Sequence, residues 1–213
     1  MKVLMTGFDP FGGECINPAY EAIKKMKSSI DNIEIVKAEI PTVFRKSIET
    51  LDLAISNENP DVVICVGQAG GRFDMTIERV AINLDDGRIK DNEGNQPIDE
   101  IIFANGKNAY FSSLPIKSIV SSITKAGIPA SVSNSAGTYV CNHLMYGLLY
   151  LIETKYPDIK GGFIHVPFIP ELVLTKRNTP CMSLDMITKS LEIAAVTACS
   201  VAVDQKLVGG SIF

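Results

Sequence analysis

The chain of 213 residues is 46% hydrophobic and 21% charged, a balance that suits a folded protein with a continuous core and argues against disorder. Its formal net charge is −4 without any long run of Lys or Arg, so we expect no nucleic-acid partner. No apolar run approaches the roughly 18 residues that cross a bilayer, and the N-terminus lacks a basic segment followed by an apolar run. We therefore expect a cytoplasmic protein without a membrane partner.

Strand-like and helix-like segments alternate from the N-terminus onward. Residues 2–8 predict a strand that leads into a glycine-rich loop, after which Asn17 and Pro18 form a typical N-cap and first-turn pair for a helix. Next in chain order we expect a strand at residues 33–40, a helix from about Thr42 to Ser56 and a buried strand at residues 61–67.

The stretch from Met75 to Pro97 interrupts this alternation. Residues 75–84 (MTIERVAINL) alternate like a strand, whereas residues 85–97 (DDGRIKDNEGNQP) are polar and rich in turn formers. Long loops within compact domains are often functional. Four acidic residues here invite a calcium interpretation, but the glycines do not fit the calcium-loop pattern, so we expect no metal. These residues are Asp85, Asp86, Asp91 and Glu93.

The alternation then resumes to the end of the chain. In order we expect a helix near Ile116 to Ala126, a strand at residues 128–135, a helix from about Cys141 to Thr154, a strand at residues 161–166 and a last helix from Ser183 to about Val203. This pattern predicts an α/β fold: one domain over residues 1–213, a three-layer sandwich whose mixed, mostly parallel sheet carries helices on both faces.

The five cysteines form an odd set without a CxxC pair, which favours free thiols in a reducing compartment. Cys65 lies in a buried strand run and Cys199 in the last helix, where a thiol usually serves as a small core side chain. Cys141 differs because it begins a helix, whose unpaired N–H groups and dipole can stabilise a thiolate and an oxyanion. A small residue that merely fits the helix start remains an equal alternative.

The chain has two histidines, and His165 is the better candidate for a catalytic base. It ends the strand GGFIH, at the edge where open α/β sheets bind ligands. His143 lies two residues after Cys141 on one helix, so the two side chains point to different faces. Glu78 is the best partner for the imidazole. Taken alone, however, a charged side chain in such a strand favours a solvated face, because charged residues are mostly exposed.

Glycine-rich loops follow two of the predicted strands. TGFDPFGG carries Phe8 and Phe11, which could wall a small apolar pocket or simply turn into the core. GQAGGR (residues 67–72) could hydrogen-bond a ligand through its backbone or simply turn. Neither loop matches a dinucleotide or phosphate-loop motif.

Several of these segments, in this order, resemble the pyroglutamyl peptidase I family of cysteine peptidases. The resemblance covers nearly the whole chain through TGFDPFGG, VGQAGGR, TIERVAIN, DNEGNQP, SAGTYVCNHLMYG, GGFIHVPFIPE and SLDMITKSLEIAA. It implies a catalytic triad of Glu78, Cys141 and His165, without a metal or organic cofactor. The implied reaction removes an N-terminal pyroglutamyl residue from peptides through a thioester.

The resemblance also implies a ring pocket and an assembly state. The pocket would be lined by Phe8, Phe11, Thr42, Ile89 and Val140, with the Gln68 backbone recognising the lactam, and Asn17 and Arg88 near the site. Arg88 would assist at the oxyanion, and the protein would form a homotetramer. Two other classes stay open from the residues themselves: a catalytically silent binding protein for a small cyclic ligand, and an amidotransferase-like thiol enzyme.

Overall fold

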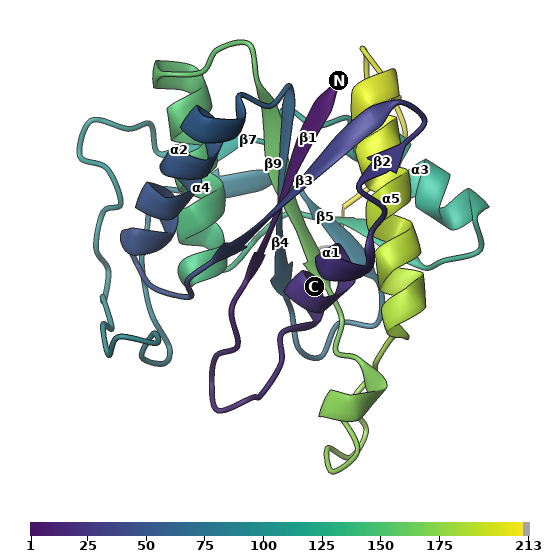
Figure 1. The fold of residues 1–213 in the computed structure, drawn as a ribbon. Coiled ribbons are helices and arrows are strands. Elements are labelled where there is room, and N and C mark those ends of the chain that lie inside the picture. Colours follow the sequence, from purple (N-terminus) through teal and green to yellow (C-terminus); the bar gives the residue numbers. More distant parts are fainter. Residues whose placement is uncertain (211–213) are drawn as a thin grey trace.

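A seven-stranded sheet with the order β2-β3-β1-β4-β9-β5-β8 runs through the molecule. The computed structural model describes residues 1–210. Its central strands are parallel, while β5 lies antiparallel to β9 and parallel to β8 (Figure 1). The strands are β1 (Lys2–Phe8), β2 (Ser29–Ile30), β3 (Ile33–Ile40), β4 (Val62–Gln68), β5 (Met75–Glu78), β8 (Ala130–Ser133) and β9 (Lys160–Val166); β6 (Val80–Ile82) and β7 (Ala109–Phe111) form a separate pair.

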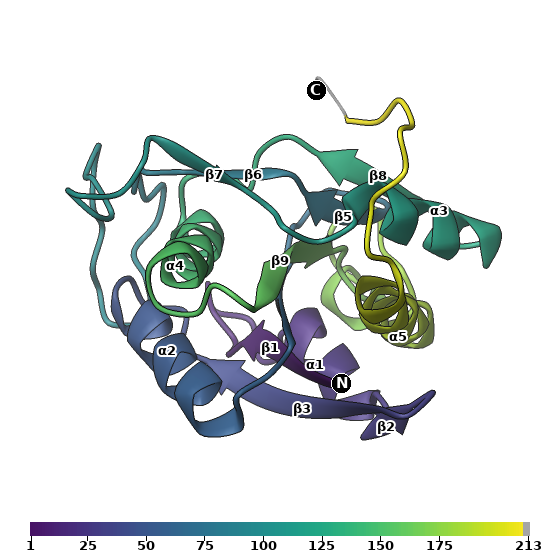
Figure 2. The same ribbon diagram turned by 90° about the horizontal axis from the view of Figure 1, so that it is seen from above.

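Helices cover both faces of the sheet, which confirms the predicted three-layer α/β architecture. In Figure 2, α2 and α4 lie on one side of the sheet, and α1, α3 and α5 lie on the other. The bounds are α1 (Pro18–Lys25), α2 (Lys46–Glu58), α3 (Ile116–Lys125), α4 (Val140–Thr154) and α5 (Leu184–Ser200), with a 3₁₀ turn at Pro170–Leu172. Among the described residues, no helix is long and apolar enough to span a membrane.

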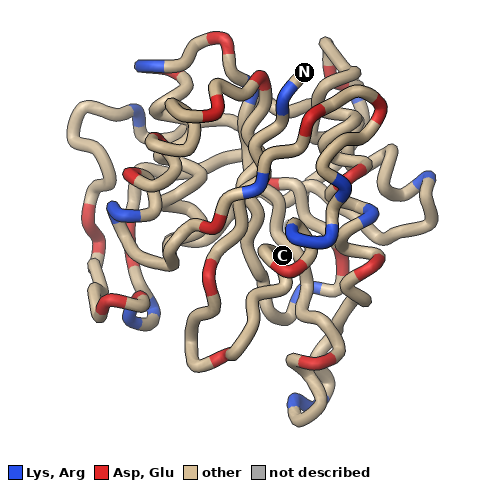
Figure 3. The backbone as a smooth tube through the Cα atoms, viewed as in Figure 1, with Lys and Arg blue, Asp and Glu red and all other residues tan. Residues whose placement is uncertain are grey.

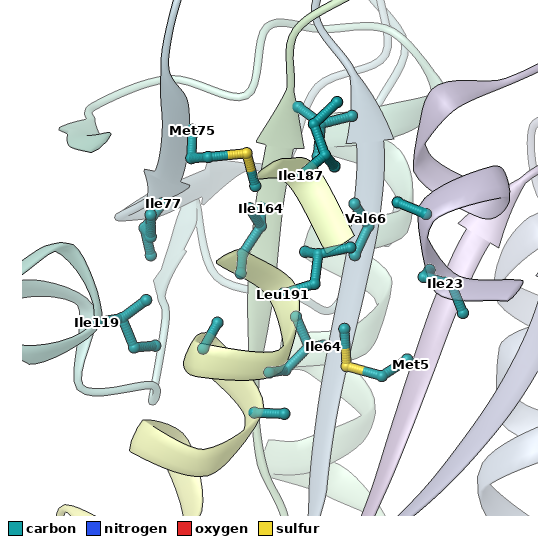
Figure 4. Close-up of a cluster of buried hydrophobic side chains, with 14 of the residues drawn as sticks. Met5, Ile23, Ile64, Val66, Met75, Ile77, Ile119, Ile164, Ile187 and Leu191 are labelled. Atoms are coloured by element: carbon teal, nitrogen blue, oxygen red, sulfur yellow. The ribbon is translucent and has the colours of Figure 1, made fainter. Parts of the chain in front are cut away.

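Each face of the sheet has its own hydrophobic core, because successive strand residues point to opposite sides. In β4, Ile64 and Val66 pack beneath α1, α3 and α5, in the core drawn in Figure 4. Val63 and Cys65 face α2 and α4. Cys65 is completely buried, as predicted, and Cys199 is partly buried against the first core.

Two predicted elements differ from the structure. The strand expected at residues 75–84 breaks at Arg79: β5 joins the main sheet, and β6 leaves it to pair with β7. The break follows from two competing ladders, since the Arg79 N–H donates to Ser133 and the Arg79 carbonyl accepts from Ser112 N–H. The helix expected from Thr42 begins only at Lys46, because Arg45 adopts a positive φ of 63°.

The loop of residues 85–97 is anchored by its acidic side chains. Asp91 accepts hydrogen bonds from the backbone N–H groups of Phe44, Glu93 and Asn95, which ties the loop to the turn before α2. These contacts lower the pKa of Asp91 although burial raises it. Figure 3 shows acidic and basic residues interspersed over the molecule rather than segregated onto separate faces.

Candidate active site

His165 and Glu78 meet at the junction between β9 and β5. The antiparallel register places Thr76 opposite His165, so the Glu78 side chain, two residues further along, projects to the same face. His165 Nδ1 and Glu78 Oε1 lie 2.8 Å apart, and both side chains are buried. The alternative that strand alternation leaves Glu78 on a solvated face is wrong.

The Glu78 carboxylate determines the tautomer of His165. Burial raises the pKa of Glu78, but the hydrogen bond and charge of His165, the nearby Ser133 hydroxyl and the charge of Arg72 together outweigh it, and the net pKa is lowered. An ionised carboxylate can only accept hydrogen bonds, so Nδ1 of His165 is the donor. The lone pair of Nε2 is then left to accept a proton, as in a general base.

Cys141 enters the same face of the sheet from the first turn of α4. Its Sγ lies directly over Gly67, where a Cβ atom would come within 2.9 Å of the sulfur. Gly67 in turn lies beside His165 in the β4–β9 ladder. Strands pair about 4.8 Å apart, so the thiol and the imidazole belong to one site although neither strand contains the cysteine.

The surroundings of Cys141 favour the neutral thiol over the thiolate. Burial raises its pKa to about 12, the negative charge of Glu78 raises it further, and Arg72 partly opposes the rise. Desolvation thus opposes the stabilisation of a thiolate that the start of a helix can provide. Attack by sulfur would need a base to remove its proton, and His165 is the base at hand.

A cavity of about 450 Å³ opens beside Cys141 and His165. From the predicted binding set, its lining includes Phe11, Gln68, Arg88 and Ile89; it also includes Ala69, Gly70, Arg72, Ala136, Gly137, Tyr139 and Phe168. The lining thus combines apolar side chains with polar groups, and Arg72 and Arg88 bring positive charge. Such a mixture suits a small, mostly apolar group that carries a few hydrogen-bonding atoms.

Four residues predicted for the pocket do not line this cavity. Phe8 and Val140 are buried in the core beneath α4. Asn17 caps α1 by accepting from Ala19 N–H and donates to the Asp9 carbonyl. All three side chains are buried. The fourth residue, Thr42, is also buried and joins the same Asp9 through backbone and hydroxyl contacts.

His143 belongs to a different buried cluster. Its Nδ1 lies 2.7 Å from Asp85 Oδ2, and its Nε2 accepts a hydrogen bond from the Arg45 N–H at 2.7 Å. Both ring nitrogens therefore already have hydrogen-bond partners, and His143 does not line the cavity beside Cys141. His143 joins α4 to the turn before α2 and to the loop after β6. It is no longer a rival to His165 as the base.

Sequence reasoning missed two contributors to the site. Arg72 donates to Glu78 Oε1 at 2.7 Å, and only its place in the GQAGGR segment could have drawn attention to it. Tyr139 lines the cavity and packs against Phe11 and Phe44. Burial raises the pKa of Tyr139 to about 12, so it stays neutral. In the sequence, only its position two residues before Cys141 could have indicated that Tyr139 belongs to the site.

Metal ligands do not gather at this site. Within residues 1–210, the structure has no group of three or more His, Cys, Asp or Glu side chains placed to hold a metal ion. The acidic residues Asp85 and Asp91 of the loop are instead engaged by His143 and by backbone N–H groups. The available chemistry is therefore that of a thiol, an imidazole, a carboxylate and two guanidinium groups.

Comparison with known proteins points to one family. Residues 1–201 match the pyroglutamyl peptidase family. The chain is 60% identical to the pyrrolidone-carboxylate peptidase of Clostridium botulinum over 212 residues, which cover 100% of both chains. It is 65% identical to the pyrrolidone-carboxylate peptidase of Thermosipho africanus over 90% of this chain and 93% of the relative. The crystal structure of pyroglutamyl peptidase I from Bacillus amyloliquefaciens superposes with a TM-score of 0.94 at 56% identity, covering 96% of this chain and 99% of that one.

Proposed function

Because this chain belongs to the pyroglutamyl peptidase family, we propose that it hydrolyses the bond after an N-terminal pyroglutamyl residue of peptides. In this reaction Cys141 is the nucleophile, His165 is the base, and Glu78 orients the imidazole. Family membership makes the chain a hydrolase. The observation that carries the residue assignment is the buried contact between Glu78 Oε1 and His165 Nδ1 on the face where Cys141 Sγ lies over Gly67.

The cavity supports a substrate with a neutral ring. Pyroglutamate has no charged amine, so Phe11 and Ile89 can cover its ring while the backbone at Gln68 hydrogen-bonds the lactam. A free α-amine in the same place would lose its hydration without an anionic partner. Selectivity for the cyclic residue over glutamate or proline would therefore come from desolvation together with the lactam hydrogen bonds.

The proposed reaction uses one imidazole for each proton transfer. His165 Nε2 takes the proton from the Cys141 thiol as sulfur attacks the acyl carbon and forms the C–S bond. The same imidazolium returns this proton to the leaving amine as the C–N bond breaks. Water then attacks the thioester, gives its proton to His165 and releases pyroglutamate with the thiol restored.

Negative charge develops on the carbonyl oxygen in both steps. Backbone N–H groups at the start of α4 and the exposed guanidinium of Arg88 are the groups proposed to stabilise it. No metal or organic cofactor enters this sequence of steps. A reductant would protect the nucleophilic thiol from oxidation.

We further propose that residues 1–213 form one catalytic domain that works in the cytoplasm as a homotetramer. Free thiols support a reducing compartment, since Cys15, Cys65, Cys141, Cys181 and Cys199 are all unpaired. The resemblance to the family supports the tetramer. Light scattering of the purified chain would measure its mass, and a monomer at micromolar concentration would contradict that assembly.

Turnover of a fluorogenic pyroglutamyl amide tests the function. We expect the wild type to release the amine from the pyroglutamyl amide but not from the matching prolyl and glutamyl amides. Cys141→Ser should lower kcat by at least about 1000-fold, because the hydroxyl is a far weaker nucleophile. The matched control is Cys15→Ser, which removes an exposed thiol outside the cavity and should keep full activity.

Either of two results would contradict the proposal. A folded, reduced wild type that binds pyroglutamate without cleaving any of the amides would indicate a binding protein. Near-normal turnover by Cys141→Ser would remove the nucleophile assignment while leaving the substrate class intact. Alkylation alone would be a poorer test, because Cys15 and Cys181 are also exposed to the reagent.

A further inference from the structure

The glycine-rich turn after β4 delivers an arginine to the buried acid of the proposed triad. The Arg72 N–H closes the turn on the Ala69 carbonyl at 3.3 Å, with Gly71 in the positive-φ region at 92°. The guanidinium then reaches across to β5, where Nη1 lies 2.7 Å from Glu78 Oε1 and 2.5 Å from Thr76 Oγ1. Its Nη2 donates to the Ser135 carbonyl at 3.2 Å.

Arg72 and His165 share a single oxygen of Glu78. Oε1 accepts from both Arg72 Nη1 and His165 Nδ1, whereas the buried Oε2 has no hydrogen-bond partner among the described residues. A carboxylate held through one oxygen by one donor could rotate about its terminal torsion. Two donors that converge on that oxygen from separate elements define both its place and its orientation.

We infer that Arg72 is a positioning residue of this site: it fixes the Glu78 carboxylate in the orientation from which Oε1 holds the imidazole of His165. This inference rests on the proposed function, in which Glu78 orients the base. Arg72 is anchored on three acceptors from β5 and the loop after β8, so its own side chain is preorganised. Its effect on the reaction passes through Glu78.

Burial distinguishes this contact from an ordinary surface ion pair. The Glu78 side chain is 0% exposed and that of Arg72 is 31% exposed, so the carboxylate has no water to replace a lost partner. The positive charge of Arg72 also contributes to the lowered pKa of Glu78. Without it, the carboxylate would take up a proton at a higher pH, and the neutral carboxyl group would no longer stabilise the imidazolium form of His165.

A double-mutant cycle between Arg72 and Glu78 tests the inference. The variants are Arg72→Gln, Arg72→Lys, Glu78→Gln and the double variant Arg72→Gln/Glu78→Gln, assayed on the pyroglutamyl amide. We expect Arg72→Gln to lower kcat by about 100-fold with little change in KM, and to lower it less than about 3-fold in the Glu78→Gln background. The acid limb of the kcat/KM profile should move to higher pH, and Arg72→Lys should recover part of the loss.

The matched control is Arg79→Gln. Arg79 is adjacent to Glu78 in sequence, but its guanidinium donates to the Gly209 carbonyl at 2.6 Å, outside the cavity. It should keep wild-type kcat and pH profile. Thermal unfolding of every variant shows whether the site is lost with the fold.

The outcomes separate this inference from the proposed function. An inactive wild type would refute the function itself. An active wild type with Arg72→Gln turnover within about twofold of it, or with independent losses in the cycle, would overturn the inference. If Arg72→Gln fails to fold, Arg72→Lys decides: an unchanged kcat and acid limb would show that charge alone suffices and that the fixed geometry of the guanidinium plays no part.

Discussion

At the scale of single residues, the site depends on the missing side chain of Gly67. A Cβ atom there would lie 2.8 Å from Phe163 Cζ and 2.9 Å from Cys141 Sγ, closer than van der Waals contact allows. The glycine therefore admits the sulfur to the surface of the sheet, beside its ladder neighbour His165. Similarly, Arg72 and His165 act on one oxygen atom of Glu78.

Gly67→Ala is expected to displace the nucleophile more than it disturbs the fold. The added methyl group would push Cys141 Sγ out of line with His165, so kcat should fall by roughly 10- to 100-fold, with a stability loss of about 1–3 kcal/mol from overpacking. Steady-state kinetics and urea unfolding measure the two effects. Gly209→Ala is the matched control, since its Cβ would meet Val132 at an ordinary 3.6 Å; equal loss of activity in both would contradict the explanation.

At the scale of elements, helix starts differ in where their caps come from. Asn17 caps α1 and Ser183 caps α5 through local side-chain contacts of the kind that sequence reveals. Helix α3 has no such local cap at Pro115. Two N–H groups of its first turn, those of Lys117 and Ser118, donate instead to Asp204, which follows α5 in the chain. The segment that follows α5 thus supplies the N-terminal cap of α3.

Asp204→Ala should lower the free energy of unfolding by about 1–2 kcal/mol, because the N–H groups at the start of α3 lose their acceptor. Asp204→Asn keeps a side-chain oxygen and should lose less. Chemical denaturation measures both, and turnover should remain at the wild-type value since Asp204 lies outside the cavity lining. Equal stability of Asp204→Ala and wild type would show that solvent replaces the cap.

At the scale of the whole molecule, buried or anchored carboxylates link folding to pH. Burial raises the pKa values of Glu78, Asp91 and Asp204, but their hydrogen bonds outweigh it, so the net pKa of each is lowered from ordinary values of 4.5, 3.8 and 3.8. The unfolded chain therefore binds protons more readily than the folded one in this range. The contribution of these groups to the free energy of unfolding is fully present above their ordinary pKa values. It is lost as the pH falls through their lowered pKa values in the folded protein.

We accordingly expect the free energy of unfolding to be nearly constant from about pH 7 to 5 and to decrease from about pH 4.5 downward. Urea unfolding across that range measures it. Asp91→Asn should be less stable at neutral pH, because its backbone donors Phe44 and Glu93 face a weaker acceptor, but its stability should depend less on acid. If the stability of Asp91→Asn fell as steeply with decreasing pH as that of the wild type, Asp91 would not be one of the groups that cause the acid dependence.

The sequence alone was sufficient for the α/β architecture and for naming the chemical groups. The periodicity of strands and helices and the capping of helices depend on residues within about four positions in the chain. These features can therefore be predicted from short segments of the sequence. The caps at Asn17 and Ser183 illustrate this. The segments that resemble the pyroglutamyl peptidase family directed attention to Glu78, Cys141 and His165. From periodicity alone, Glu78 could as well have faced solvent.

The tertiary structure decided how those groups meet. Glu78 and His165 are 87 residues apart in the chain and touch only through the β5–β9 register. The same long-range packing breaks the strand at Arg79 and brings Arg72 to the carboxylate. It also partly buries Cys141, and this desolvation raises the pKa of the thiol to about 12. Strand register and burial arise from contacts between distant segments, and desolvation depends on everything that surrounds a group; neither quantity is encoded in any short stretch of the chain.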